Sequence, residues 1–507
     1  MIFYCDEWLY QTCKRMARRS DTLIRNAAIM DGSGDEPYDA DVAITGDRIS
    51  AVGKLDAYLA QHVLDASGSI LAPGFIDVHT HDDTSVIRTP EMLPKLSQGV
   101  TTVIVGNCGI SAAPVHLRGV APDPMNLLGD CEAFCYPTFG SYVAAVKAAR
   151  PAVNVAALVG HTALRNNHMP SLERTATSAE IEAMRDDLRE ALFHGALGLS
   201  TGVAYLSAYS ASVQEVLALA ELVGQTGGIY TAHIRSEAAA VLEAMEEAFS
   251  VGRHCKMPVV ISHLKCAGID NWGRSYELLK LLDSVSRNQE VACDCYPYDA
   301  SSSTLDLRQV DERVEIKITW STPHPEMGGK TLAQIAHTWG VPQSEAARRL
   351  QPAGAIYHSM SEADMRMILS HPMTLIGSDG LPNDPRPHPR LWGTFPRVLG
   401  YYAREQKLLP FPTAVRKMTA LAALRFGLSH RGFVRQGYMA DLVLFDAKTV
   451  RDTATFADPI RPADGIVAVW VNGVLSYWQG SPSGDRAGRF LPREHGFPYT
   501  CVAEDAR

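Results

Sequence analysis

The chain has 507 residues, of which 46% are hydrophobic and 20% charged, and its formal net charge is −9. This composition excludes an intrinsically disordered, fibrous or low-complexity chain, because such chains cannot bury a large core. No segment approaches the about 18 consecutive apolar residues that a membrane-spanning helix requires, and Lys and Arg form no basic run. We therefore expect a soluble globular protein with neither a membrane nor a nucleic acid as its partner.

The ten cysteines are too few and too scattered for a disulfide scaffold. Residues 1–21 carry acidic side chains where a signal peptide would need an unbroken apolar stretch. We interpret them as a non-secretory extension, with Met16 as an alternative start, and we expect a cytoplasmic location.

The two flanks of the remaining chain share one pattern. Residues 22–72 and 434–495 contain short apolar runs separated by Gly- and Asp-rich turns, and Asn472-Gly473 is a typical hairpin signal. We expect both flanks to build one small β-sandwich domain.

Residues 73–433 have a different sequence pattern, in which apolar, β-branched runs alternate with amphipathic stretches. Two of these stretches predict helices, at Ser178–Ala196 with Ser178 as N-cap and at Ser236–Gly252. Such alternation predicts a parallel sheet covered by helices, and eight runs favour a TIM-like (β/α)₈ barrel with an insertion around residues 299–370. The eight predicted strands are Pro73–His81, Val100–Cys108, Val153–His161, Gly195–Gly202, Gly227–Arg235, Pro258–Lys265, Glu290–Tyr298 and Pro372–Asp379.

Metal-ligating side chains stand at the ends of these runs. His79 and His81 are two residues apart, which places both imidazoles on one face of a strand. Either histidine alone could be a core residue, and a strand-end cysteine or aspartate could be a packing or capping residue. Six such residues at the same end of one barrel instead predict a divalent-metal site: they are His79, His81, Cys108, His233, His263 and Asp379.

Several motifs resemble one known family. The segments GFIDVHTHDD, VGNCGISAAP, LGLSTGVAY, YTAHIRSE, ISHLKCAG, GSDG and HPRLWGTFPRVLG are similar to those of the N-acyl-D-amino-acid deacylases (D-aminoacylases) of the amidohydrolase superfamily. The resemblance covers roughly residues 22–480, including the MADLVLFD segment near the C-terminal end. It implies a metal-dependent hydrolase barrel in which a cysteine, here Cys108, replaces the carboxylated lysine of other superfamily members.

The resemblance also implies roles for the predicted ligands. Cys108, His233 and His263 would hold a tightly bound Zn²⁺, while His79, His81 and Asp379 would line a second, weaker position. Zinc held by a thiolate and two imidazoles keeps a place open for water and lowers the pKa of that water toward about 7. Asp379 would then carry a proton from the water to the leaving amine.

The substrate implied is an N-acyl-D-amino acid. In the family, the counterparts of Lys265, Arg390 and Tyr205 bind its α-carboxylate, although Arg390 alone would read as a surface arginine. The ITWSTPHPE segment resembles N-acyl-D-glutamate deacylase most closely and favours an acidic side chain. Arg308, with Arg313 and Lys317 as further candidates, would pair with that side chain; alternatively, these residues are a solvated charged insertion.

Three other functions stay open at this point. A deacylase of hydrophobic N-acyl-D-amino acids fits the same ligands, and so does a hydrolase of cyclic amides or dipeptides, which the cysteine disfavours. A non-catalytic scaffold is disfavoured because every expected ligand is present. The sequence makes no prediction of oligomeric state.

Overall fold

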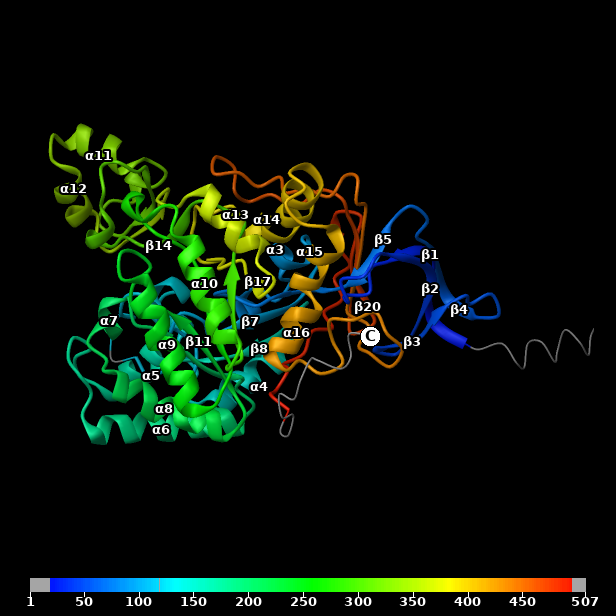
Figure 1. Cartoon of the computed structure of the whole chain (residues 1–507), viewed down its shortest axis with the longest axis horizontal. Helices are drawn as coiled ribbons and strands as arrows, with labels where there is room; N and C mark the ends of the chain where they lie inside the picture. Colours follow the sequence, from blue (N-terminus) through cyan, green and yellow to red (C-terminus); the bar gives the residue numbers. More distant parts are fainter. Residues whose placement is uncertain (1–18, 118, 495–507) are drawn as a thin grey trace, which may run out of the picture.

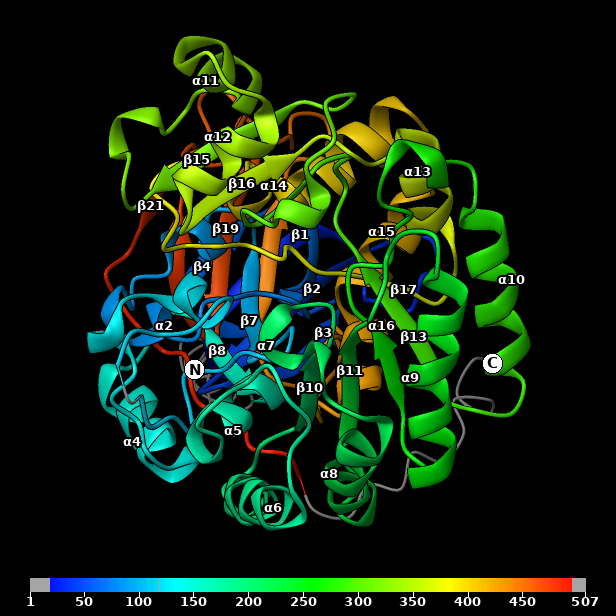
Figure 2. The same ribbon diagram turned by 90° about the vertical axis from the view of Figure 1, so that its left-hand side faces the viewer.

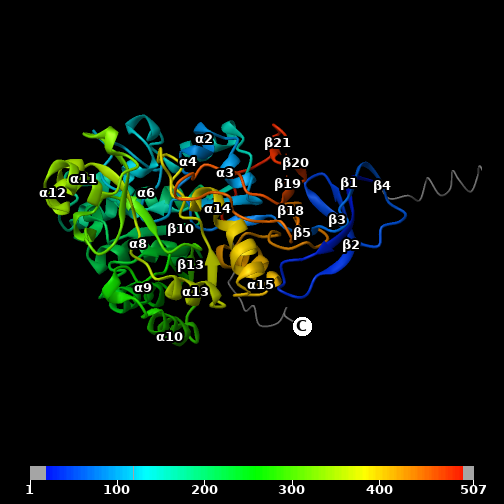
Figure 3. The same ribbon diagram turned by 90° about the horizontal axis from the view of Figure 1, so that it is seen from above.

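The computed structural model describes residues 19–117 and 119–494. The two flanks of the chain form one nine-stranded sheet, whose strands β1 to β4 lie at one end of the molecule in Figure 1 and Figure 3. Strand β18 pairs antiparallel with β5 and thereby joins the N-terminal strands to the C-terminal ones. The strands are β1 (Arg19–Ile29), β2 (Tyr38–Thr45), β3 (Arg48–Gly53), β4 (Leu59–Asp65), β5 (Ile70–Pro73), β18 (Leu442–Phe445), β19 (Ile466–Val471), β20 (Val474–Trp478) and β21 (Ser481–Pro482).

Two boundaries of this region differ from the sequence-based expectation. Strand β1 begins at Arg19, so residues 19–21, which we assigned to the N-terminal extension, are part of the sheet. Residues 1–18 of that extension lie outside the described residues. At the other flank, Gly488 and Leu491 donate backbone hydrogen bonds to Pro151 and Val155, and Phe490 packs edge-on against Phe139. The last described residues therefore lie against the other domain and not in the sheet.

The central part of the chain forms the predicted barrel, and each predicted run contains a strand. All neighbouring strands are parallel, in two ladders, β6-β7-β8 and β9-β10-β11-β12-β13-β17. Strands β8 and β9 are separated by one residue, and a parallel bridge between Thr80 and Gly380 links the first strand to the last. The strands are β6 (Phe75–Asp77), β7 (Val100–Val105), β8 (Asn154–Ala157), β9 (Val159–Gly160), β10 (Gly198–Gly202), β11 (Ile229–His233), β12 (Val259–Ile261), β13 (Val291–Cys295) and β17 (Thr374–Ile376).

Helices cover the outside of the barrel (Figure 2). The first predicted helix is α6, capped by Thr177 through a reciprocal capping box with Glu180, so that Ser178 is its first residue and not its cap. The helices of one turn or more in this region are α2 (Ser85–Arg88), α3 (Leu93–Leu96), α4 (Phe139–Ala149), α5 (His161–His168), α6 (Ser178–Phe193), α7 (Leu206–Tyr209), α8 (Val213–Gln225), α9 (Val241–Cys255), α10 (Ser275–Ser286), α13 (Glu362–Ser370), α14 (Arg390–Arg397), the π-helix η6 (Val398–Glu405), α15 (Phe411–Met418) and α16 (Ala420–Phe426).

The expected insertion lies between β13 and α13 and has its own small core. A three-stranded antiparallel sheet in the order β14-β16-β15 packs against two short helices, which form a lobe beside the barrel in Figures 1 and 2. Its elements are β14 (Ser301–Thr304), β15 (Ile316–Ser321), α11 (Leu332–Trp339), α12 (Gln343–Leu350) and β16 (Ala353–Tyr357). No helix among the described residues is long and apolar enough to cross a lipid bilayer.

Candidate metal centre and active site

Six potential metal ligands meet where the barrel strands end. They follow β6, β7, β12 and β17 or, as His233 does, form the last residue of β11. The donor atoms form two groups that share Cys108, one with His233 and His263 and the other with His79, His81 and Asp379. Within each group all donor atoms lie within 4.8 Å of one another. The structure thus brings together every ligand that the sequence predicts.

The contacts between these donors are short. Cys108 Sγ lies 3.2 Å from His79 Nε2 and 3.2 Å from His263 Nε2. His263 Nε2 lies 3.1 Å from His233 Nδ1, and His81 Nε2 lies 3.1 Å from Asp379 Oδ1. All six side chains are buried. Soft thiolate and imidazole donors converging in this way are the ligand set that zinc prefers.

Three of the six donors have an unusual backbone conformation. Cys108, His263 and Asp379 have φ values of 53°, 35° and 48°, in the left-handed region that non-glycine residues seldom occupy. Each residue comes directly after a barrel strand, where the chain turns away from the sheet. Such backbone strain is typical of functional sites, since it persists only when the surrounding structure enforces it.

Two carboxylates that the sequence analysis did not single out hold the imidazoles in place. Asp294 Oδ2 lies 3.1 Å from His79 Nδ1, and Asp294 Oδ1 accepts a hydrogen bond from the backbone N–H of His263. Glu237 Oε1 lies 2.9 Å from His263 Nδ1. A carboxylate on Nδ1 leaves Nε2 of the same ring available as a donor, which is how metal-binding histidines are usually oriented. The described residues therefore fit a bound metal.

Both carboxylates carried weak sequence signals. Asp294 stands in the VACDC segment between Cys293 and Cys295, where no spacing relative to another predicted ligand marks it. Glu237 lies in the segment predicted to be helical from Ser236, but α9 begins only at Val241. Residues 236–240 instead form a loop, and this loop carries Glu237 to His263 and Lys265.

The charges in the cluster shift the ionisation of its members. Burial raises the pKa of the Cys108 thiol, but the imidazoles of His79 and His263 outweigh burial and hold that pKa well below its ordinary value. Burial also raises the pKa of Asp379, and Arg390 and His79 likewise reverse the effect. Both shifts favour the thiolate and the carboxylate, which are the forms in which these groups bind a metal.

A buried ion cluster lies beside the two histidines that follow β6. Lys95 is fully buried, and its Nζ lies 2.7 Å from Asp77 Oδ2 and 3.1 Å from Asp82 Oδ2. The ammonium also donates to Thr80 and Ser378, the neighbours of His79 and Asp379 in the chain. Lys95 therefore stabilises the two segments that carry these ligands, and it is not itself placed as a ligand.

Arg390 and Lys265, for which the family resemblance implies a substrate-binding role, lie beside the cluster. Arg390 is fully buried, with Nη1 2.8 Å from Asp379 Oδ2, and its Nη2 donates to the carbonyl of Ser302 at 2.9 Å. Lys265 pairs with Glu237. The ring of Tyr296 lies between these cations, with its centroid 4.6 Å from Arg390 Cζ and 6.0 Å from Lys265 Nζ. Arg390 is thus not a surface arginine.

Tyr205 and Arg308 lie at different distances from the ligands. The ring centroid of Tyr205 is 4.7 Å from that of His233, which places the phenol at the cluster. Arg308 is exposed, pairs with Asp306, and donates from Nη2 to the carbonyl of Ala204 at 2.9 Å. The structure therefore brings Tyr205 into the site and leaves Arg308 at its rim.

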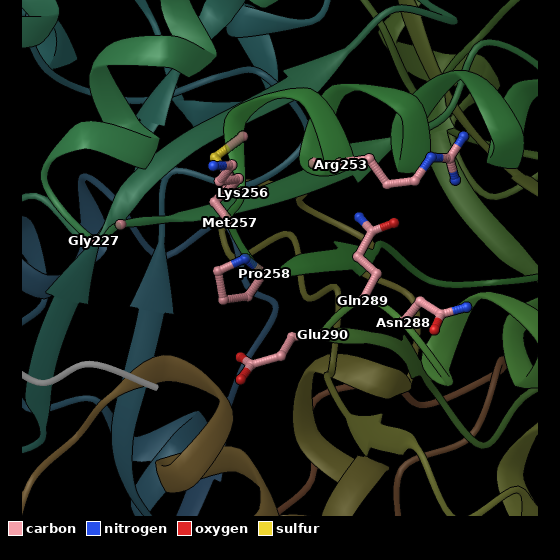
Figure 4. Close-up of a pocket in the computed structure, with 10 residues that line it drawn as sticks. Gly227, Arg253, Lys256, Met257, Pro258, Asn288, Gln289 and Glu290 are labelled. Carbon is pink, nitrogen blue, oxygen red and sulfur yellow. The ribbon is translucent and has the colours of Figure 1, made fainter. Parts of the chain in front are cut away.

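A large open hollow lies at the opposite end of the barrel (Figure 4). Its volume is about 470 Å³, and its walls come from the end of α9 and from the residues just before β11, β12 and β13. None of the six clustered donors lines it. The labelled residues include Arg253, Lys256, Asn288 and Glu290, and this hollow is separate from the candidate metal centre.

Comparison with known proteins agrees with this geometry. A model of the amidohydrolase family matches residues 62–477. Over 93–96% of this chain and 98% of each relative, the sequence is 47% identical to D-aminoacylase, 47% identical to N-acyl-D-aspartate deacylase and 46% identical to N-acyl-D-glutamate deacylase, all from Alcaligenes xylosoxydans xylosoxydans.

Two solved structures extend the comparison to the fold. The crystal structure of D-aminoacylase superposes with a TM-score of 0.92 at 47% identity, and it covers 94% of this chain and 100% of that chain. N-acyl-D-glutamate deacylase from Bordetella bronchiseptica, solved with zinc and a phosphonate inhibitor that mimics the tetrahedral intermediate, gives a TM-score of 0.90 at 46% identity with the same coverage. The described chain therefore has the TIM-barrel fold of these enzymes, and the protein belongs to the amidohydrolase family.

Proposed function

We propose that this protein is a zinc-dependent deacylase that hydrolyses the amide bond of N-acyl-D-amino acids to a carboxylate and a free D-amino acid. The observation that carries the proposal is the convergence of Cys108 with four imidazoles and Asp379 at one end of the barrel. Relatives that match this protein over nearly the full chain include D-aminoacylase and the N-acyl-D-aspartate and N-acyl-D-glutamate deacylases. Their activities support the same reaction class here.

The ligand assignment follows the two groups of donors. Cys108, His233 and His263 would hold a tightly bound zinc, and His79, His81 and Asp379 would line a second, weaker position. Bound zinc polarises the amide carbonyl and makes a nucleophile of water at neutral pH. Asp294 and Glu237 support this assignment because they orient His79 and His263 toward the shared thiolate.

Asp379 is the proposed proton carrier. Its carboxylate is buried, and Arg390 and His79 lower its pKa, so that it is ionised and offers an unprotonated oxygen to the attacking water. Cleavage then requires a proton on the leaving nitrogen, and the protonated Oδ of Asp379 can deliver it. Arg390 fixes the carboxylate from the other side through the contact with Oδ2.

Lys265, Arg390 and Tyr205 form the proposed site for the α-carboxylate. Both cations lie on the same ring of Tyr296, and Tyr205 borders the ligand His233. If the α-carboxylate, the Cα hydrogen and the scissile carbonyl are all held, the side chain of the substrate has one direction available, and this geometry selects the D over the L configuration.

The test is a panel of N-acetyl-D- and N-acetyl-L-amino acids with the zinc-loaded enzyme. We expect turnover of D substrates and at least a 100-fold lower kcat/KM for their L enantiomers, a difference of about 2.7 kcal/mol. Failure with every N-acetyl-D-amino acid, or faster turnover of hydantoins or dipeptides, would contradict the proposal.

We further propose that the preferred side chain is acidic, as in N-acyl-D-glutamate. Arg308 supports this, because it holds a guanidinium at the rim beside the loop of Tyr205. We expect Arg308→Ala to lower kcat/KM for N-acetyl-D-glutamate about tenfold and to leave N-acetyl-D-leucine nearly unchanged. Arg313→Ala is the matched control, since Arg313 is also exposed and pairs with Asp270 and Asp311. Higher wild-type kcat/KM for N-acetyl-D-leucine would refute the acidic preference.

A reduced, cytoplasmic location is part of the same proposal. Cys108 has to remain a thiolate to bind zinc, and the seven cysteines in the described part of the chain are all free. A small-molecule substrate is the partner that this site would serve.

A further inference from the structure

Strand β14 of the insertion contacts three separate segments of the barrel domain through three consecutive residues. The carbonyl of Ser302 accepts the hydrogen bond from Arg390, and the Oγ of Ser303 lies 3.4 Å from the hydroxyl of Tyr205. The next residue, Thr304, hydrogen-bonds the carboxyl group of Asp123. The insertion therefore touches two of the three side chains proposed to bind the α-carboxylate of the substrate.

The position of Ser303 is fixed by the sheet of the insertion. In the antiparallel register of β14 and β16, Ser303 lies opposite Ala355 and Thr304 opposite Gly354. The hydroxyl of Tyr357 donates to the carbonyl of Thr304 and closes the end of the strand. The Oγ of Ser303 is thus presented from a paired strand and not from a free loop end.

Two contacts of the Tyr205 side chain bear on the position of its phenol. It lies between the end of β10 and the four-residue helix α7, and its side chain is only half-buried. One face of its ring contacts His233, and its hydroxyl contacts Ser303. Without the Ser303 hydroxyl, the phenol could move away from the position in which it reaches a bound carboxylate.

We propose that Ser303 is a positioning residue for substrate recognition, which holds the Tyr205 phenol in the α-carboxylate site. This inference rests on the proposed deacylase function. Its consequence is that the insertion contributes to substrate affinity, while the chemistry of bond cleavage depends on the barrel.

The experiment measures KM and kcat separately for Ser303→Ala, using N-acetyl-D-glutamate or N-acetyl-D-leucine, whichever the wild type turns over more efficiently. Loss of one neutral hydrogen bond predicts an increase in KM of about three- to fivefold with kcat within about twofold of the wild type. Ser303→Thr keeps the hydroxyl and should restore the wild-type KM. Ser301→Ala is the matched control, because Ser301 is a half-buried serine on the same face of the same strand.

A double-mutant cycle identifies Tyr205 as the residue through which Ser303 acts. In a Tyr205→Phe background, Ser303→Ala should cause no further change in KM, since the shared contact is already absent. An unchanged KM in Ser303→Ala, or a change that persists in the Tyr205→Phe background, would overturn the inference and leave the deacylase function standing. If Ser303→Ala does not fold, Ser303→Cys, which keeps the size and loses the strong hydroxyl contact, has to give the same KM increase. Absence of wild-type turnover on any N-acyl-D-amino acid would instead reject the function itself.

Discussion

The two ends of the barrel differ in what they offer a ligand. The N-terminal end has an open hollow of about 470 Å³ lined by residues such as Lys256 and Glu290. The C-terminal end has buried, closely packed donors, strained backbone at Cys108, His263 and Asp379, and carboxylates that orient the imidazoles. The candidate reactive end is therefore the C-terminal one, because it is identified by the chemistry and orientation of its side chains and not by the size of a hollow.

The largest expected effect is the loss of the shared donor at the C-terminal end. Cys108→Ser should remove tightly bound zinc and lower kcat/KM by more than the about 10–100-fold that loss of an outer-shell partner costs. Metal analysis after dialysis and steady-state kinetics measure both. Cys266→Ser is the control, because Cys266 is an equally buried thiol next to Lys265. Retention of both zinc and full activity in Cys108→Ser would refute the ligand assignment.

A second buried cluster near this end is predicted to stabilise the fold only. Glu215, which is fully buried, pairs with His161 and Arg165. Breaking such a buried pair costs about 3–5 kcal/mol of unfolding free energy. We therefore expect Glu215→Gln to be strongly destabilised and its folded fraction to keep near-normal kcat. Denaturant unfolding provides the measurement, and Glu221→Gln, at an exposed position of the same helix α8, is the control.

This cluster also predicts a pH dependence of stability. Burial raises the pKa of Glu215, but His161 and Arg165 outweigh it and lower that pKa to about 2, compared with 4.5 for a free glutamate. Because the folded-state pKa is the lower one, the stabilisation is present above about pH 4.5 and is lost as the pH falls toward 2. Unfolding of Glu215→Gln should lack this part of the acid dependence, and an unaltered acid profile would contradict the assignment.

The third effect concerns the carboxylates that orient the ligands. Glu237→Gln should weaken zinc binding about 10–100-fold, because the amide no longer provides a charged acceptor for His263 Nδ1. Competition with a zinc chelator measures this without any assay of activity. Glu247→Gln on α9 is a suitable control, since Glu247 pairs with Arg235 away from the donors. Unchanged zinc affinity would show that Glu237 has no orienting role.

The sequence was sufficient for the barrel and for the meeting of the six candidate donors, because the ends of parallel strands meet at one end of a barrel. It was insufficient for contacts between residues that lie far apart in the chain. Asp294 and His79 are 215 residues apart, and no local pattern marks their contact. The loop at Glu237 replaces a turn of helix that periodicity favours, because tertiary contacts with Lys265 and His263 outweigh helix propensity.

The partners of the Arg390 side chain were equally unpredictable from the sequence. A Pro-rich segment before it is typical of a surface loop, yet the side chain is fully buried against Asp379, Ser302 and Tyr296. The contact with Ser302 needs the insertion, whose own fold is set by its small core and not by the barrel. No sequence signal separates residues 488–493 from the rest of the C-terminal flank, and their place is shown by backbone hydrogen bonds to the barrel domain.

The last prediction compares two lysines at opposite ends of the barrel, and the smallest expected effect is that of Lys256→Ala. Lys265→Ala removes a buried cation beside Tyr296, and we expect kcat/KM to fall about 10–100-fold, as for the loss of a charged hydrogen bond. Lys256→Ala removes an exposed cation from the wall of the open hollow, and kcat/KM should stay within about twofold, with unfolding free energy within about 0.5 kcal/mol of the wild type. A marked loss of activity in Lys256→Ala would mean that the hollow communicates with the metal centre, because none of the residues that line the hollow is one of the six donors.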